Sequence, residues 1–148
     1  MVESSLDEDK DQALLFVYGT LLRGFENAPF LGSPDKAVFF LAGKIPCALY
    51  DLGPFPAILK PAECKPGEHC THGEIYQVND PLVLFETLDL IEGYNHQHPQ
   101  RSLYIREKIT ADTREGPREV WAYFYNQPLE NAVLIESGNY RDYIAGKI

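Results

Sequence analysis

Residues 79–93 have the sequence NDPLVLFETLDLIEG, which contains the start, the apolar face and the end of one long helix. Asp80 is suited to cap free backbone N–H groups, Pro81 to the first helical position and Gly93 to the end of the helix. These signals predict a helix from Pro81 to about Glu92. Strand-like segments precede and follow it, which is not the regular strand–helix alternation of a doubly wound parallel sheet.

Short apolar or alternating segments on both sides of this helix predict the strands. They are Leu14–Tyr18, Ala37–Leu41, Cys47–Leu52, Phe55–Leu59, Gly73–Val78, Leu103–Thr110 and Val120–Tyr125. Between them, Lys60–Thr71 lacks periodicity and is expected to be an exposed connection, while Pro128–Glu136 is expected to form a short second helix. The pattern favours an α+β fold in which a small mixed sheet, curved or barrel-like, carries one main helix.

Length and composition indicate one globular domain at residues 13–148, after an acidic tail at 1–12 that is expected to be flexible. The formal net charge of −9 has the wrong sign for gripping phosphate backbones, so no nucleic acid partner is expected. No apolar stretch approaches the roughly 20 residues that a bilayer requires, and no secretory signal is apparent. We therefore expect a cytoplasmic protein without membrane contact, as a monomer or weak dimer.

The cysteines of this chain are Cys47, Cys64 and Cys70. Their small and odd number does not suit a disulfide framework, so free thiols in a reducing compartment are expected. Two of them, with His69 and His72, superficially resemble metal ligands. Their spacing matches no standard zinc pattern, so no metal is expected.

Glu92 is an acidic residue on the apolar side of the predicted helix. The apolar stripe consists of Leu84, Phe85, Leu88 and Ile91. Glu92 follows Phe85 by seven positions and Leu88 by four, which places it within the stripe. Burial and the negative end of the helix would both raise its pKa, which makes it a candidate general base and acid. The alternative is a frayed helix-end residue that turns into solvent. At the edge of the stripe, Asp89 is expected to be paired or exposed, with a supporting role at most.

The turn Tyr18-Gly19-Thr20-Leu21 follows the first predicted strand. Gly19 permits a sharp turn and a close backbone approach, which can leave successive N–H groups pointing at an anion such as a carboxylate. The alternative is a purely structural turn, because the sequence is neither a phosphate loop nor a dinucleotide-binding motif.

Four short segments, taken in order and spacing, resemble the gamma-glutamylcyclotransferase-like family, in particular its gamma-glutamylamine cyclotransferase type. They are VYGTL at 17–21, LGPFPA at 52–57, GEIY at 73–76 and LDLIEG at 88–93. Later segments, including Tyr104–Arg106 and Ser137–Arg141, are also similar. The resemblance spans about residues 14–143.

This resemblance implies a mixed fold around a small barrel and a cofactor-independent enzyme of the acyltransferase or lyase kind. Such enzymes cyclise a gamma-glutamyl group, releasing pyroglutamate (5-oxoproline) and a free amine or amino acid. Glu92 would be the catalytic base and acid, the backbone of Gly19–Leu21 would hold the substrate α-carboxylate, and Tyr18 and Tyr125 would line the pocket. The alternative is a non-catalytic module of the same fold that binds a small carboxylate or another protein. Which gamma-glutamyl compound is the substrate stays open.

Overall fold

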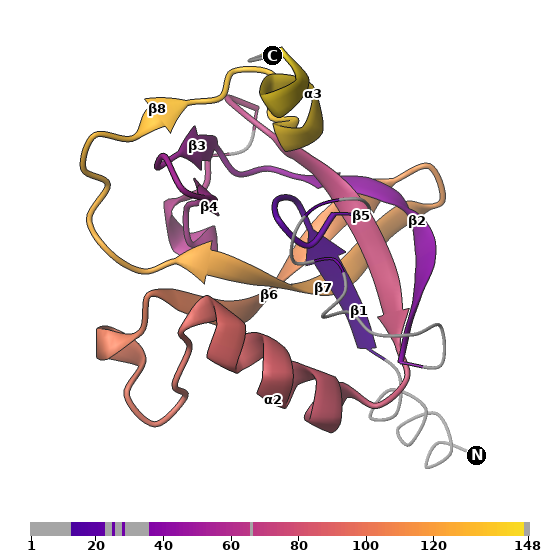
Figure 1. The fold of residues 1–148 in the computed structure, drawn as a ribbon. Helices are drawn as coiled ribbons and strands as arrows, with labels where there is room; N and C mark the ends of the chain where they lie inside the picture. The colour runs from indigo at the N-terminus through magenta and orange to yellow at the C-terminus, as the bar shows by residue number, and fades with distance from the viewer. Residues whose placement is uncertain (1–12, 23–24, 26–27, 29–35, 66, 147–148) are drawn as a thin grey trace.

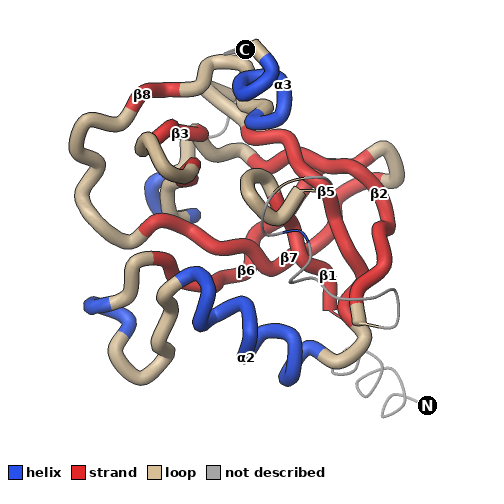
Figure 2. Tube along the Cα trace, viewed as in Figure 1, coloured by secondary structure: helices blue, strands red, loops and turns tan. Residues whose placement is uncertain are grey.

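The computed structural model describes residues 13–22, 25, 28, 36–65 and 67–146, so the predicted acidic tail at 1–12 lies outside the described part. Five strands close into a barrel in the order β1-β5-β2-β6-β7 (Figures 1 and 2). Their bounds are β1 Ala13–Val17, β2 Ala37–Ile45, β5 Thr71–Val78, β6 Tyr104–Thr113 and β7 Gly116–Tyr125. The predicted first strand, Leu14–Tyr18, is shifted by one residue relative to β1. β2, β5 and β7 extend the predicted segments, and β6 begins one residue after the predicted start at Leu103 and ends three residues later than predicted.

A second, smaller sheet lies beside the barrel, with the strand order β4-β3-β8 (Figure 1). Its strands are β3 Leu49–Asp51, β4 Pro56–Ile58 and β8 Val133–Leu134, and the helices are α2 Pro81–Glu92, α3 Tyr140–Ala145 and the 3₁₀ turns η2 Pro61–Glu63 and η3 Pro99–Arg101. This architecture confirms the predicted mixed α+β fold with a small barrel, one main helix and one short one.

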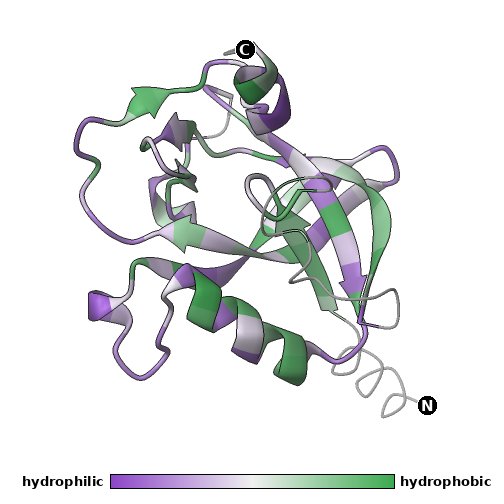
Figure 3. Ribbon diagram, in the orientation of Figure 1, coloured by the Kyte–Doolittle hydropathy of each residue, from purple (hydrophilic) through white to green (hydrophobic). Residues whose placement is uncertain are grey.

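β1 closes the barrel, because it pairs with β5 on one side and with β7 on the other. β1 pairs antiparallel with β5, where Leu15 faces Tyr76, and parallel with β7, where Leu15 faces Trp121. Its residues Leu15, Phe16 and Val17 are fully buried, and Figure 3 shows the hydrophobic colour along this strand. Because the strand is anchored on both sides, the turn that follows it has a fixed position.

Helix α2 begins and ends where the sequence predicts. Gly93 adopts the left-handed conformation, with φ 68°, and the Asp89 carbonyl accepts hydrogen bonds from the N–H groups of Gly93 and Tyr94. This arrangement is a common way to end a helix at a glycine. The predicted Asp80 cap is wrong in one respect, because its side chain makes no capping hydrogen bond. Phe85 packs against Trp121 of β7, with ring centroids 6.0 Å apart.

The predicted helix at Pro128–Glu136 is wrong. That segment instead contains β8, where Leu134 pairs with Tyr50 of β3. The short second helix is α3, which begins after Asn139, whose side chain accepts a hydrogen bond from the Asp142 N–H at 3.1 Å. Pairing with a strand that is distant in sequence has overridden a local helical pattern.

The expectation of three free thiols is also wrong. Cys47 and Cys64 form a disulfide with their Cα atoms 4.8 Å apart, and Cys70 is free. The bridge forms because the antiparallel β3–β4 pair lies between the two cysteines in sequence and brings its own ends together. One end of the predicted Lys60–Thr71 connection is therefore fastened to the small sheet.

Across the described residues, no helix has both the length and the apolar character needed to cross a membrane. In the same part of the chain, no group of His, Cys, Asp and Glu side chains is placed to hold a metal ion.

Candidate active site

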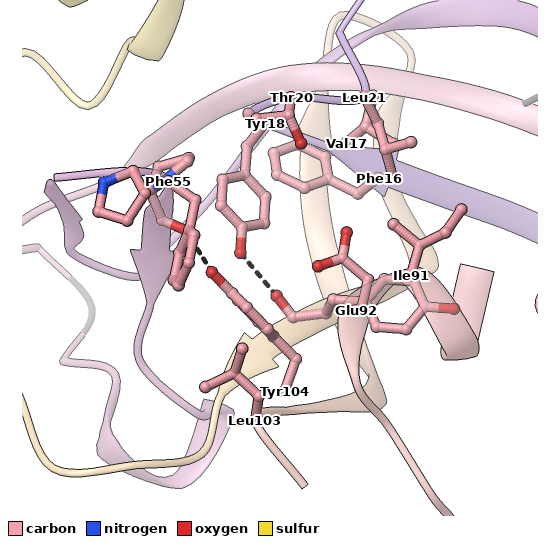
Figure 4. A pocket seen from close by; sticks show the side chains of 14 residues that line it. Phe16, Val17, Tyr18, Thr20, Leu21, Phe55, Ile91, Glu92, Leu103 and Tyr104 are labelled. Atoms are coloured by element: carbon pink, nitrogen blue, oxygen red, sulfur yellow. Dashed lines mark hydrogen bonds between the residues drawn. The ribbon is translucent and has the colours of Figure 1, made fainter. Parts of the chain in front are cut away.

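A cavity of about 280 Å³ opens where the turn after β1, the start of β4, the end of α2 and the start of β6 meet (Figure 4). It is lined by Phe16, Val17, Tyr18, Gly19, Thr20, Leu21, Pro54, Phe55, Pro56, Ile91, Glu92, Leu103, Tyr104 and Tyr123. Among these described lining residues, Glu92 is the one acidic or basic side chain. The cavity therefore combines an aromatic and apolar wall with a single carboxylate.

Glu92 is the last residue of α2, and its carboxylate lies at the cavity opposite Tyr18 (Figure 4). The left-handed turn at Gly93 ends the helix immediately after it, so Glu92 keeps helical geometry and stays on the side of buried Leu88. Burial raises the pKa of the Glu92 carboxyl from 4.5 to about 7. A group with this pKa can both accept and return a proton near neutral pH.

The turn after β1 packs directly against the small sheet. A side chain at Gly19 would place its Cβ 2.5 Å from Cγ of Pro56, so glycine is required for this close approach. The hydrogen bond that closes the turn is donated by the Leu22 N–H to the Gly19 carbonyl, at 3.0 Å. Gly19, Thr20 and Leu21 of this turn line the cavity.

Of the three tyrosines that line the cavity, Tyr18 and Tyr104 donate their hydroxyl protons to backbone carbonyls. Tyr18 donates to the Tyr123 carbonyl at 2.8 Å, and Tyr104 donates to the Pro56 carbonyl at 2.7 Å (Figure 4). Burial, with the nearby Glu92 carboxylate among the further causes, raises the pKa of both hydroxyls well above its ordinary value. They stay protonated near neutral pH, and because their protons are already engaged, they offer the cavity lone pairs that can accept a hydrogen bond.

Asp89 lies one turn before Glu92 and is paired, as expected. Arg106 of β6 contacts both of its carboxylate oxygens, at 3.0 and 3.3 Å. The Tyr123 hydroxyl donates to Asp89 Oδ1 at 2.6 Å. The end of α2 is thus fastened to β6 and β7 through one carboxylate.

Five of the six predicted site residues line the same cavity: Tyr18, Gly19, Thr20, Leu21 and Glu92. Tyr125 is not in the cavity lining and instead packs edge-on against Tyr104, with ring centroids 5.5 Å apart. Sequence reasoning did not assign Tyr104 or Tyr123 to the site. Both side chains are buried, and the sequence signal was limited to their aromatic character, because their position depends on the β6–β7 pairing.

The sequence of this chain matches one known family model over most of its length. Residues 15–142 match the family model described as "Gamma-glutamyl cyclotransferase, AIG2-like". This chain belongs to that family. The match covers the barrel strands, except Ala13 and Leu14 of β1, and all the residues of the cavity.

Relatives within the family cover most of the chain. A proposed gamma-glutamylcyclotransferase of Methanocaldococcus jannaschii is 33% identical over 135 residues, which span 87% of this chain and 96% of the relative. The solution structure of YtfP from Escherichia coli has a TM-score of 0.57 at 29% identity and covers 88% of this chain and 98% of that one. The crystal structure of a mouse AIG2-like protein has a TM-score of 0.60 at 24% identity, covers 79% and 80% of the two chains, and supports the fold.

Proposed function

We propose that this family member is an enzyme that cyclises a gamma-glutamyl group, releasing 5-oxoproline and the amine or amino acid that was attached to it. The observation that carries the proposal is the Glu92 carboxylate at the cavity, opposite the turn formed by Tyr18–Leu21. Membership in the family and the names of its relatives support the same reaction.

The two sides of the cavity suit the two charged groups of a gamma-glutamyl compound. The backbone amides at Gly19, Thr20 and Leu21 would hold the α-carboxylate, since clustered N–H groups bind anions. The α-amino group would lie near Glu92 and the tyrosine oxygens, which act as acceptors. Holding both groups folds the chain of the substrate, so that its amine and its γ-carbonyl come together.

Glu92 would then move one proton through the reaction. Its carboxylate takes a proton from the α-amino group as the nitrogen attacks the γ-carbonyl carbon and forms the ring C–N bond. The protonated Glu92 then gives that proton to the leaving nitrogen as the original amide C–N bond breaks. The products are 5-oxoproline, which keeps its α-carboxylate and has an uncharged lactam ring nitrogen, and a free amine, and Glu92 returns to the carboxylate form.

The test measures 5-oxoproline release from a panel of gamma-glutamyl amines, dipeptides and isopeptides. General acid–base catalysis contributes about 10²- to 10⁴-fold, so Glu92→Gln should lose activity on that scale while its thermal unfolding stays cooperative. Glu86→Gln is the matched control, because Glu86 lies on the same helix but is exposed. Full turnover by Glu92→Gln would refute its role. Carboxylate binding without turnover, unchanged by Glu92→Gln, would instead support the non-catalytic module.

A further inference from the structure

We infer that Asp89, clamped by Arg106, is a positioning residue that holds Glu92 and the Tyr123 wall of the cavity in their working arrangement. This inference rests on the proposed function for its catalytic consequence. Its structural part concerns the end of α2 and can be tested without turnover.

The Asp89–Arg106 contact is an oriented, two-point ion pair. Arg106 Nε lies 3.0 Å from Asp89 Oδ1, and Nη2 lies 3.3 Å from Oδ2. The two side chains are only 17% and 19% exposed, so solvent screens this pair less than the exposed pair Arg118–Glu115. Planar two-point contacts between guanidinium and carboxylate fix direction as well as distance.

Aromatic rings hold the Arg106 guanidinium in this orientation. Its central carbon lies 4.2 Å from the centroid of the Phe85 ring of α2 and 4.9 Å from that of the Trp121 ring of β7. Cations are attracted to the faces of such rings. The guanidinium therefore lies between the helix and the barrel, and its direction towards Asp89 is set from both sides.

Asp89 also connects to both walls of the cavity. Its backbone carbonyl accepts the Gly93 and Tyr94 N–H groups in the turn that ends α2 immediately after Glu92. Its side chain accepts the Tyr123 hydroxyl at 2.6 Å, while the Tyr123 carbonyl accepts the Tyr18 hydroxyl at 2.8 Å. A displacement of the Asp89 side chain would reach the helix end and the first turn together.

The opposite charges of Asp89 and Arg106 also offset each other near the Glu92 carboxylate. Residues three apart on a helix are neighbours, with Cβ atoms roughly 5–6 Å apart. An unpaired Asp89 would add a negative charge near the Glu92 carboxylate, and an unpaired Arg106 would add a positive one. Among the described residues, the titratable and charged groups around Glu92 are Tyr18 after β1, Asp89 on α2, Tyr104 and Arg106 on β6, and Tyr123 on β7. The cavity-lining residues around β4, which are Pro54, Phe55 and Pro56, have uncharged side chains that do not titrate.

The experiment is an NMR titration of the Glu92 carboxyl carbon, assigned by its loss in Glu92→Gln. Asp89→Asn and Arg106→Met each break the two-point contact, so if that contact holds Glu92 in its buried position, both variants should bring its pKa from about 7 towards 4.5. The change of charge alone would instead lower the pKa in Asp89→Asn and raise it in Arg106→Met. Glu115→Gln, which breaks the exposed Arg118–Glu115 pair, is the control and should cause no shift. Shifts of opposite sign in the two variants, or none in either, would overturn the inference.

Turnover gives a second readout. Tyr123→Phe keeps the ring and removes the hydroxyl, so kcat should fall several-fold while the protein stays folded. The acid limb of the rate profile should follow the NMR shifts in Asp89→Asn. If the wild-type protein forms no 5-oxoproline from any substrate, the proposed function fails, yet the NMR titration still decides whether Asp89 positions Glu92. If Asp89→Asn does not fold, the measurements on Arg106→Met and Tyr123→Phe test the inference instead.

Discussion

Glu92 is buried enough that its protonation state changes near neutral pH, where burial places its pKa at about 7. A catalytic base must be unprotonated, so kcat/KM for 5-oxoproline release should fall about tenfold per pH unit below that value. The measurement is kcat/KM from pH 5 to 9 with several substrates. A midpoint that is the same for all substrates reports a group of the enzyme and not of the substrate. An acid limb centred near 4.5 would show that Glu92 is solvated or is not the base.

The same burial has a cost in stability. Between pH 4.5 and 7 the folded protein binds a proton at Glu92 that the unfolded chain releases, so this residue lowers the free energy of unfolding as pH rises through that range. The full penalty above pH 7 is about 3 kcal/mol. At pH 8, the free energy of unfolding of Glu92→Gln, measured with urea, should be higher than that of the wild type by up to that amount. The two proteins should become equal near pH 4, and a difference independent of pH would contradict this account.

At the scale of elements, the turn after β1 and the start of β4 are fitted to one another at Gly19. A Cβ there would lie 2.5 Å from the rigid ring of Pro56, so Gly19→Ala must push the turn and β4 apart. We expect unfolding free energy to fall by about 1–3 kcal/mol and KM to rise. Gly146→Ala is the control, since its nearest contact is 3.5 Å. Unfolding by urea and substrate saturation curves measure the two effects, and wild-type values for both would rule out the proposed fit.

The elements that could be predicted are those whose signals are local. Helix α2 has a proline at its start and a left-handed glycine at its end, and the apolar side between them is visible in the sequence. The failures depend on partners distant in sequence: Leu134 pairs with Tyr50, which no local pattern at 128–136 could show. Helix α3 has only six residues, too few for a clear periodic pattern, and in the structure the Asn139 side chain caps its start.

The candidate site divides in the same way. Glu92 and the turn at Gly19 could be predicted because each has a local signal in the sequence. For Glu92 the signal is an acidic residue on an apolar helix face, and for Gly19 it is a glycine directly after an apolar strand. Tyr104 and Tyr123 could not be predicted, since their place at the cavity depends on how β6 pairs with β7. The role of Arg106 could not be predicted either, because its partner Asp89 is 17 residues away and lies on another element.

At the scale of the whole molecule, the Cys47–Cys64 bridge closes a loop with a sequence separation of 17 that contains β3 and β4. Closing a loop of this length contributes about 3 kcal/mol by restricting the unfolded chain. Cys64→Ser should lower the free energy of unfolding by that amount, and a thiol reductant should bring the wild type to the same value. Cys70→Ser leaves the bridge intact and should have little effect. A Cys64→Ser variant as stable as the wild type would contradict the contribution assigned to the bridge.

The closure of the barrel between β1 and β7 also affects how copies of the chain meet one another at high concentration. A strand at the border of an open sheet can recruit a strand from another molecule and so begin aggregation. In the described part of the chain, all five barrel strands have neighbours on both sides, and the remaining borders belong to β4 and β8, which have three and two residues. Such short borders are poor templates, which would help this protein remain dispersed in a crowded solution.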